Sequence, residues 1–146
     1  MHLCVAFDGS DDAYDSLSAL VGLFDPARTR RVTVAVLAWP LRESPIWEKA
    51  LERRIEVDDL HEAMAEVVER ETLRLRALFS DRTKVETMVG EGDPVEAMLS
   101  ATAGDPPDLV LIGVTGGLHR RAVLGVVGEF LARTPFRVVV ANGKSH

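Results

Sequence analysis

The sequence has a single cysteine, Cys4, so no disulfide can form within one copy of the chain. Cys4 lies in an apolar run, where we expect a buried thiol with a structural role. No apolar stretch approaches the roughly 20 residues that a membrane-spanning helix needs. The opening residues, HLCVAFD, show no basic leader of the kind that secretory signals carry. These absences predict a cytoplasmic protein with no membrane partner.

Positive charge is in the minority, with 17 Lys and Arg against 23 Asp and Glu and a net charge of −6 at pH 7. Nucleic-acid binding needs a basic surface, so this balance argues against a nucleic-acid partner. It leaves open a local anion site made of backbone N–H groups, because such a site needs no net positive charge.

Catalytic motifs and metal-ligand spacings are also missing. The sequence has no nucleophile elbow and no Ser-His-Asp set in a recognisable context. The spacing of His2, His61 and His146 fits no metal site. We therefore expect no catalytic residues and no metal ligands.

Strand and helix patterns do alternate along the chain. Strands are predicted at Leu3–Phe7, Val32–Leu37, Val85–Val89, Leu109–Ile112 and Phe136–Ala141. Helices are predicted after Ser10 as N-cap, from at least Asp58 to Phe79, from Pro94 with Asp93 as N-cap, and up to Arg133. Pro40 and Pro45 oppose regular structure in WPLRESPIW. The alternation predicts one doubly wound α/β domain over residues 1–146, a parallel sheet with helices on both faces.

Ligands of such folds bind beyond the carboxyl ends of the strands, where the strand order reverses. Two loops compete for that place, DGSDD after the first strand and GVTGG after the fourth. We interpret Gly113 and Gly116 as loop residues that permit positive φ.

Rival classes with the same alternation fit these loops poorly. DGSDD is acidic and would repel the phosphate of a flavin, and it has only a faint echo of the Ser-Gly-Gly loop of an ATP pyrophosphatase. A phospho-acceptor domain needs an Asp directly after the third strand. Here GEGDP places Asp93 at a helix start instead.

Five pieces taken in order, VAFDGSDDAYDSL, VTVAVLAWP, VETMVGEGDPVEAML, DLVLIGVTGG and GVVGEFLARTPFRVVVA, resemble the universal stress protein family over nearly the whole chain. The resemblance implies an α/β fold with a five-stranded parallel sheet, in the order 3-2-1-4-5, and a dimer. Some members of the family bind ATP and others do not. The binders carry a loop of Gly, two residues, Gly, nine residues, Gly, then Ser or Thr.

This chain departs from that loop in two ways. Only eight residues, Gly117 to Leu124, separate Gly116 from Gly125, and Val126 stands where the binders have a hydroxyl residue. Valine cannot donate a hydrogen bond to phosphate. A charge-assisted hydrogen bond contributes about 1.5–3 kcal/mol, so its loss weakens binding by roughly ten- to a hundred-fold.

Other positions match the family's nucleotide site. The resemblance places Asp8 near the nucleotide and Leu37 and Ile112 against the base, while Thr115 offers a hydroxyl in place of the missing one. The full candidate set is Asp8, Gly9, Leu37, Ile112, Gly113, Thr115, Gly116, Gly117, Gly125, Val126 and Val127. The implied ligand is ATP or another adenine nucleotide, with Mg²⁺ if ATP is bound. The adjacent basic residues His119, Arg120 and Arg121 fit a γ-phosphate, an acidic partner or a solvated loop.

The last strand is apolar and lies at an edge of the expected sheet, and such an edge pairs readily unless it is covered. The family commonly dimerises through this strand. We therefore expect a homodimer through Phe136, Val138, Val139 and Val140. The function expected is a non-enzymatic, regulatory stress domain with a degenerate or weak adenine-nucleotide site and unidentified protein partners. The alternative is an ATP-binding member of the family that hydrolyses ATP slowly.

Overall fold

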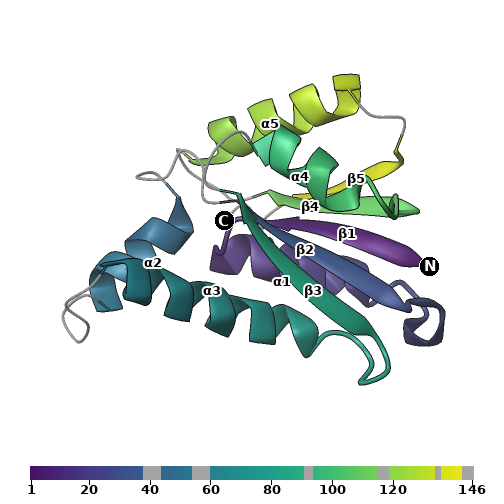
Figure 1. The fold of residues 1–146 in the computed structure, drawn as a ribbon, viewed down its shortest axis with the longest axis horizontal. Coiled ribbons are helices and arrows are strands. Elements are labelled where there is room, and N and C mark those ends of the chain that lie inside the picture. Colours follow the sequence, from purple (N-terminus) through teal and green to yellow (C-terminus); the bar gives the residue numbers. More distant parts are fainter. Residues whose placement is uncertain (38–43, 54–59, 91–93, 115–118, 134–135, 143–146) are drawn as a thin grey trace.

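Five parallel strands lie side by side in one sheet in the computed structural model, in the order β3-β2-β1-β4-β5 (Figure 1). The structure describes the chain except residues 38–43, 54–59, 91–93, 115–118, 134–135 and 143–146. The strands are β1 (His2–Phe7), β2 (Arg31–Leu37), β3 (Lys84–Gly90), β4 (Leu109–Val114) and β5 (Val138–Asn142). The expected fold class and strand order are confirmed.

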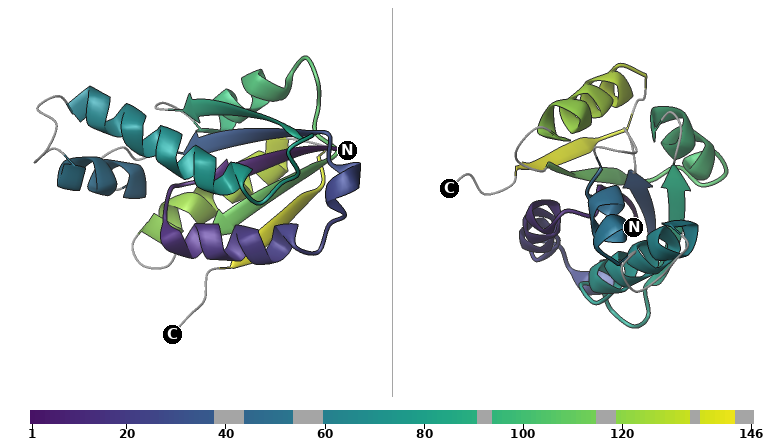
Figure 2. Two further views of the ribbon diagram at one scale, coloured as in Figure 1. Left: turned by 90° about the horizontal axis from the view of Figure 1, so that it is seen from below. Right: turned by 90° about the vertical axis from the view of Figure 1, so that its left-hand side faces the viewer.

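Helices cover both faces of the sheet. They are α1 (Asp11–Val21), α2 (Pro45–Arg53), α3 (Leu60–Arg76), α4 (Pro94–Thr102) and α5 (His119–Arg133), with a short 3-10 turn at Pro26–Arg28. Viewed along the sheet, α1, α2 and α3 lie on one side, and α4 and α5 lie on the other (Figure 2). Among the described residues, no helix is long and apolar enough to cross a membrane.

The core is divided by the sheet into two apolar clusters. Along β1, Leu3, Val5 and Phe7 point into the cluster under α1, α2 and α3, whereas Cys4 and Ala6 point into the cluster under α4 and α5. All five side chains are at most 1% exposed. A strand buried on both faces needs apolar residues at every position, which explains the continuous apolar run in the sequence.

The turn from β1 into α1 forms as its residue types predict. Gly9 has a φ of +84°, the left-handed region in which a side chain is disfavoured. The side chain of Ser10 caps α1 by accepting a hydrogen bond from the N–H of Ala13 at 3.1 Å. Asp11 and Asp12 follow in the first turn, where the helix dipole favours negative charge.

Two predicted features of the middle of the chain are wrong. Pro45 does not oppose regular structure but is the first residue of α2, a position where its missing N–H costs nothing. Ser44 caps this helix, because its hydroxyl accepts a hydrogen bond from the N–H of Trp47 at 3.2 Å. The helix predicted from at least Asp58 to Phe79 ends earlier, at Arg76, and is followed by a turn.

The last strand begins later than predicted, at Val138. Phe136 lies outside it and packs into the core beneath α4 and α5, with its ring centroid 6.3 Å from that of Phe130. The end of α5 at Arg133 and the start of α4 at Pro94 agree with the sequence. The expected N-cap of α4, Asp93, lies outside the described residues.

A polar network joins the three helices on one face. Glu71 on α3 is only 3% exposed, and its carboxylate contacts Lys49 of α2 at 2.8 Å and Arg74 at 2.9 Å. The same two cations reach Asp11 on α1, at 3.1 Å and 2.9 Å. Arg74 also lies over the ring of Tyr14, 4.0 Å from its centroid. Glu71 is thus a buried carboxylate held between two cations.

Gly113 allows α1 to approach β4 closely. A Cβ atom on Gly113 would lie 3.0 Å from the carbonyl oxygen of Ala13 and 3.0 Å from Cγ of Leu17. Both neighbours are fully buried and one contact is to backbone, so neither can move aside easily. The prediction that Gly113 has positive φ is wrong, because Gly9 alone among the described glycines has that conformation. Gly113 is needed for packing.

We predict that Gly113→Ala lowers the free energy of unfolding by about 1–3 kcal/mol, because the added methyl group overpacks the contact between α1 and β4. Gly128→Ala is the control, since a Cβ there meets nothing within 4 Å and the residue lies inside α5. That variant should gain about 0.5–1 kcal/mol from the better helix propensity of alanine. Urea denaturation of both variants measures the difference. Equal effects would contradict the packing role of Gly113.

We also predict a pH dependence from Asp11. Hydrogen bonds from Arg74 and Lys49 lower the pKa of this carboxyl in the folded chain. A lowered pKa stabilises the fold fully above the unfolded value of about 3.9, and this contribution disappears as the pH falls through the folded value. The gap in unfolding free energy between wild type and Asp11→Asn should therefore close on acidification below pH ~4. A gap that is constant with pH would show that the ion pairs contribute nothing.

Candidate functional site

The carboxyl ends of β2, β1 and β4 lie next to one another at the place where the strand order reverses. The register pairs Phe7 with Val36 and Ala6 with Ile112. One residue further along each strand, Asp8 therefore lies beside Leu37, and Gly113 lies beside Phe7. The carboxyl ends of the first and fourth strands thus lie next to each other, as expected for a doubly wound sheet.

Asp8 is held by its own turn. Its carboxylate oxygen Oδ1 accepts a hydrogen bond from the N–H of Ser10 at 2.9 Å, and the residue is only 1% exposed. Gly9 lies against Ile46 of α2, so closely that a Cβ would be 2.4 Å from the Cδ1 atom of that side chain. Figure 1 shows α2 beyond the carboxyl ends of the strands, the edge at which this turn lies.

Ile46 was missed by the sequence reasoning. It is fully buried and packs over the β1–α1 turn, so it is part of the candidate site. The available signal was Ser44 followed by Pro45, an N-cap and a first helical residue. The prolines of that stretch were interpreted as opposing regular structure, so the helix that carries Ile46 was not predicted.

The residues expected against the base all belong to the core. Leu37 is 4% exposed, Ile112 is 1% exposed, and both pack into the cluster beneath α4 and α5. Val127 joins the same cluster at 6% exposure. Within the described residues, these side chains therefore offer little free surface to a base.

The expected phosphate residues are divided between a helix and the undescribed loop. Gly125, Val126 and Val127 lie inside α5, the seventh to ninth residues of a helix that begins at His119. Backbone N–H groups at such positions donate to carbonyls four residues earlier in the same helix. Thr115, Gly116 and Gly117 lie outside the described residues.

The N-terminus of α5 begins with three basic residues, His119, Arg120 and Arg121, and its first turn has no acidic residue. The first four N–H groups of a helix have no partner within it, and they carry the positive end of the helix dipole. Cations at this end are unfavourable for the helix alone and favourable beside an anion. The helix start, rather than Gly125, is the place where this chain offers free backbone donors.

Catalytic and metal chemistry finds no support in the described part of the chain. No group of three or more His, Cys, Asp or Glu residues there is placed to hold a metal ion. Cys4 is 1% exposed, and burial raises the pKa of its thiol to about 12. A thiol with such a high pKa is a poor nucleophile near neutral pH, which agrees with a structural role.

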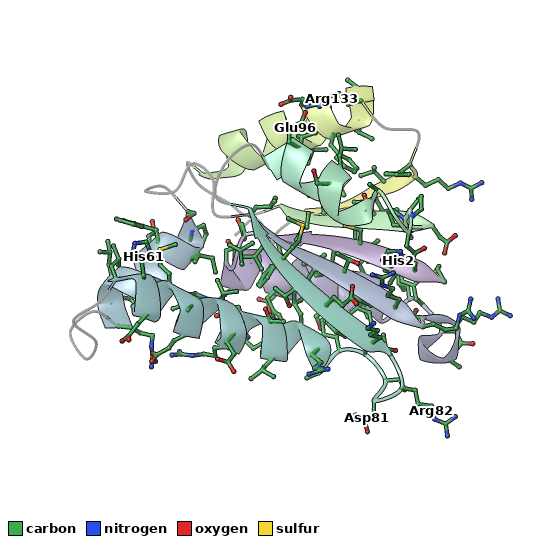
Figure 3. The ribbon with its side chains drawn as sticks, in the orientation of Figure 1. His2, His61, Asp81, Arg82, Glu96 and Arg133 are labelled. Carbon is green, nitrogen blue, oxygen red and sulfur yellow. The ribbon has the colours of Figure 1, made fainter. Side chains whose placement is uncertain are left out.

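A separate groove of about 550 Å³ runs between α3 and the edge strand β3. Its wall includes Met64, Val68 and Leu73 from α3 and Val85 and Val89 from β3. His61, shown on α3 in Figure 3, lies at this groove and is exposed. None of the residues expected to bind a nucleotide lines it, so this groove is distinct from the candidate site.

Comparisons with known proteins agree with this fold. The model of the universal stress protein family matches residues 1–141. The universal stress protein in the QAH/OAS sulfhydrylase 3′ region of Thermus aquaticus is 29% identical over 143 residues, which cover 96% of this chain and 90% of that protein.

Two solved structures have the same fold at low sequence identity. Hypothetical protein MJ0577 superposes with a TM-score of 0.67 at 16% identity, covering 99% of this chain and 97% of its own. A universal stress protein in complex with cAMP superposes with a TM-score of 0.59 at 14% identity, covering 97% and 96%. Because the family model spans nearly the whole chain, this protein belongs to the universal stress protein family.

Proposed function

We propose that this chain is a non-enzymatic regulatory domain of the stress response, with a weak adenine-nucleotide site at the carboxyl ends of β1 and β4. The observation that carries the proposal is the state of Asp8. A ribose hydroxyl would have to reach a carboxylate that is 1% exposed and already accepts the N–H of Ser10. Opening this turn costs part of the binding free energy, so binding is weak.

The residues expected to contact phosphate also support weak binding. Val126 supplies no hydroxyl, and the N–H groups at Gly125 to Val127 lie at helix-interior positions. A phosphate would instead meet the free N–H groups at the start of α5, where the sequence also supplies Arg120 and Arg121. This contact needs no Ser or Thr after Gly125, which makes it a different solution from that of the family's ATP binders.

Adenine nucleotides remain the ligand class of choice because the fold and the loop pattern are those of the family, and one solved neighbour is described in complex with cAMP. Bound ATP would bring Mg²⁺, which neutralises phosphate charge near the acidic turn at Asp8. The regulatory output would be a change in the surface of a dimer. No step in this proposal requires a catalytic residue.

An ATP-binding member with slow hydrolysis is the second candidate. It is favoured by the position of Asp8, Gly9 and Ile112 at the reversal of strand order, where ligands of this fold class bind. The two candidates differ in affinity and in product formation. ATP binding with a dissociation constant of about 1 µM or tighter and slow release of ADP would support the second candidate over the first.

We predict that isothermal titration calorimetry of ATP with Mg²⁺ gives a dissociation constant of roughly 10–100 µM or weaker, because binding has to open the buried turn at Asp8. Val126→Ser should not tighten binding, because residue 126 lies in the interior of α5. Arg121→Ala should weaken it by roughly ten-fold if phosphate lies at the start of α5.

Asp12→Asn is the matched control for Asp8→Asn, because Asp12 lies four residues on in an exposed helical turn. Asp8→Asn should abolish the remaining heat of binding and Asp12→Asn should leave it unchanged. A dissociation constant of about 1 µM or tighter for the wild type, or tight binding by Val126→Ser, would contradict the weak-site proposal.

We further propose that the chain forms a homodimer through the edge strand β5. The outer position of β5 in the sheet supports this, together with the exposure of Val139 and Val140, each 37% exposed. Leu131 on α5 adds a further exposed apolar side chain, at 50%. Phe136, in contrast, packs against Phe130 within the chain and is a weaker candidate for the interface.

The expected mass in solution at micromolar concentration is twice the 16.0 kDa of one chain. Val140→Lys should give monomers, because pairing would bury the new charge at the edge. Leu73→Lys, on an exposed residue of α3 away from β5, should remain dimeric. Light scattering after size exclusion measures all three masses. A monomeric wild type would overturn the dimer and leave the nucleotide proposal standing.

A further inference from the structure

The amino-terminal edge of the sheet, opposite to the candidate nucleotide site, brings two connecting loops together. The N–H of Lys84 donates to the carbonyl of Arg30 at 2.9 Å, and the hydroxyl of Thr83 donates to the carbonyl of Thr29 at 2.8 Å. These bonds hold the residues before β2 against the residues before β3. They place Arg30 and Arg82 on the wall of one hollow of about 600 Å³.

The charge of this hollow is uncompensated. Arg30 and Arg82 are exposed, and across the described ranges neither takes part in an ion pair. Asp25 at the rim is already engaged, by the N–H of Ala27 at 3.0 Å and by Arg28 at 3.8 Å. Two free guanidinium groups thus share one hollow in a chain whose net charge is −6.

The neighbouring charges are paired among themselves. Arg31 contacts Glu86 and Asp105, and Lys84 contacts Glu86 at 3.0 Å. Asp81 is next to Arg82 in sequence, but its side chain points away from that of Arg82 (Figure 3) and does not line the hollow. Arg30 and Arg82 therefore keep unpaired positive charge in the hollow.

Ser80 adds a hydrogen-bond donor to the same wall. Its Oγ atom accepts the N–H of Arg82 at 3.2 Å, and its own hydroxyl hydrogen is available to a ligand. Two guanidinium groups and a hydroxyl match the acceptors of carboxylates.

A second hollow of about 650 Å³ adjoins the basic one, shares Asp25, Ala27 and Arg30 with it, and is lined by Arg28 as well. Its wall includes Phe24 and Leu23, and Leu23 is 81% exposed, the largest exposure among the large apolar residues described. An exposed leucine beside unpaired arginines is the composition of a protein-binding surface, where an apolar anchor is surrounded by charges that select the partner.

We propose that these two hollows form a docking surface for an acidic segment of a protein partner, whose carboxylates bind Arg30 and Arg82 while an apolar side chain packs on Leu23. Charge complementarity selects the occupant, because the surface offers unpaired cations in an otherwise acidic chain. A small anion such as phosphate would use the arginines and leave Leu23 uncovered, so an acidic polypeptide fits the surface better. This surface does not depend on nucleotide binding.

Fluorescence anisotropy with a short labelled peptide of glutamate and leucine tests the proposal on the full chain. The peptide should bind, and binding should weaken as salt rises. The double variant Arg30→Glu/Arg82→Glu should weaken it by about ten-fold or more. The control is Arg70→Glu/Arg76→Glu, which changes the net charge equally at two arginines on α3 with no ion pair in the described structure. Its affinity should stay within about two-fold of the wild type.

Leucine variants measure the apolar contribution to peptide binding separately from the contribution of the arginines. Leu23→Ser should weaken peptide binding by about three- to ten-fold, whereas Leu73→Ser, on the 55% exposed leucine of α3, should not. Inorganic triphosphate should compete poorly. The proposal is overturned if the peptide does not bind at millimolar concentration, if both arginine double variants behave alike, or if triphosphate displaces the peptide as well as unlabelled peptide does.

Discussion

The burial of β1 on both faces and along both edges is the constraint on which the rest of the structure depends. β2 and β4 pair with its two edges, and the helices press on its two faces, so each residue from Leu3 to Phe7 is at most 1% exposed. A backbone in that position must have all its polar groups paired by its neighbours. The chain turns away from the sheet at the end of β1, where Gly9 has a positive φ and Ser10 caps α1. The packing of the chain alone therefore determines the position of the turn at Asp8.

The same close packing crowds the candidate site. α1 approaches β4 at Gly113 and α2 approaches the β1–α1 turn at Gly9, each so closely that a side chain would collide. The edge at which ligands of this fold class bind is therefore closely packed in this chain, with Ile46 against the turn. Regulation by a weak ligand or by a protein partner suits such a site, because binding would have to displace contacts that stabilise the chain.

Charge is distributed unequally between the two ends of the sheet. Near the carboxyl end, Asp8, Asp11 and Asp12 lie around the start of α1, and Arg74 and Lys49 bind Asp11 and the buried Glu71. At the amino end, Arg31 is satisfied by Glu86 and Asp105, while Arg30 and Arg82 are not paired in the described structure. Because paired charges are largely self-satisfied, Arg30 and Arg82 are the pair at this end of the sheet that is available to an outside partner. A protein with a negative net charge thus has a local basic surface at Arg30 and Arg82.

The sequence by itself determined the alternation of strands and helices, the parallel sheet, the cap at Ser10 and the helix start at Pro94, because these depend on local residue types and on periodicity. The sequence also showed the resemblance to the family, which depends on five sequence segments that follow one another in a fixed order. Tertiary structure alone decided that Phe136 packs on Phe130 outside the strand and that Glu71 is buried between two cations. It alone showed that Gly113 is required by α1 and that Val127 belongs to the core. Each of these depends on which distant segment lies opposite, and no spacing along the chain records that.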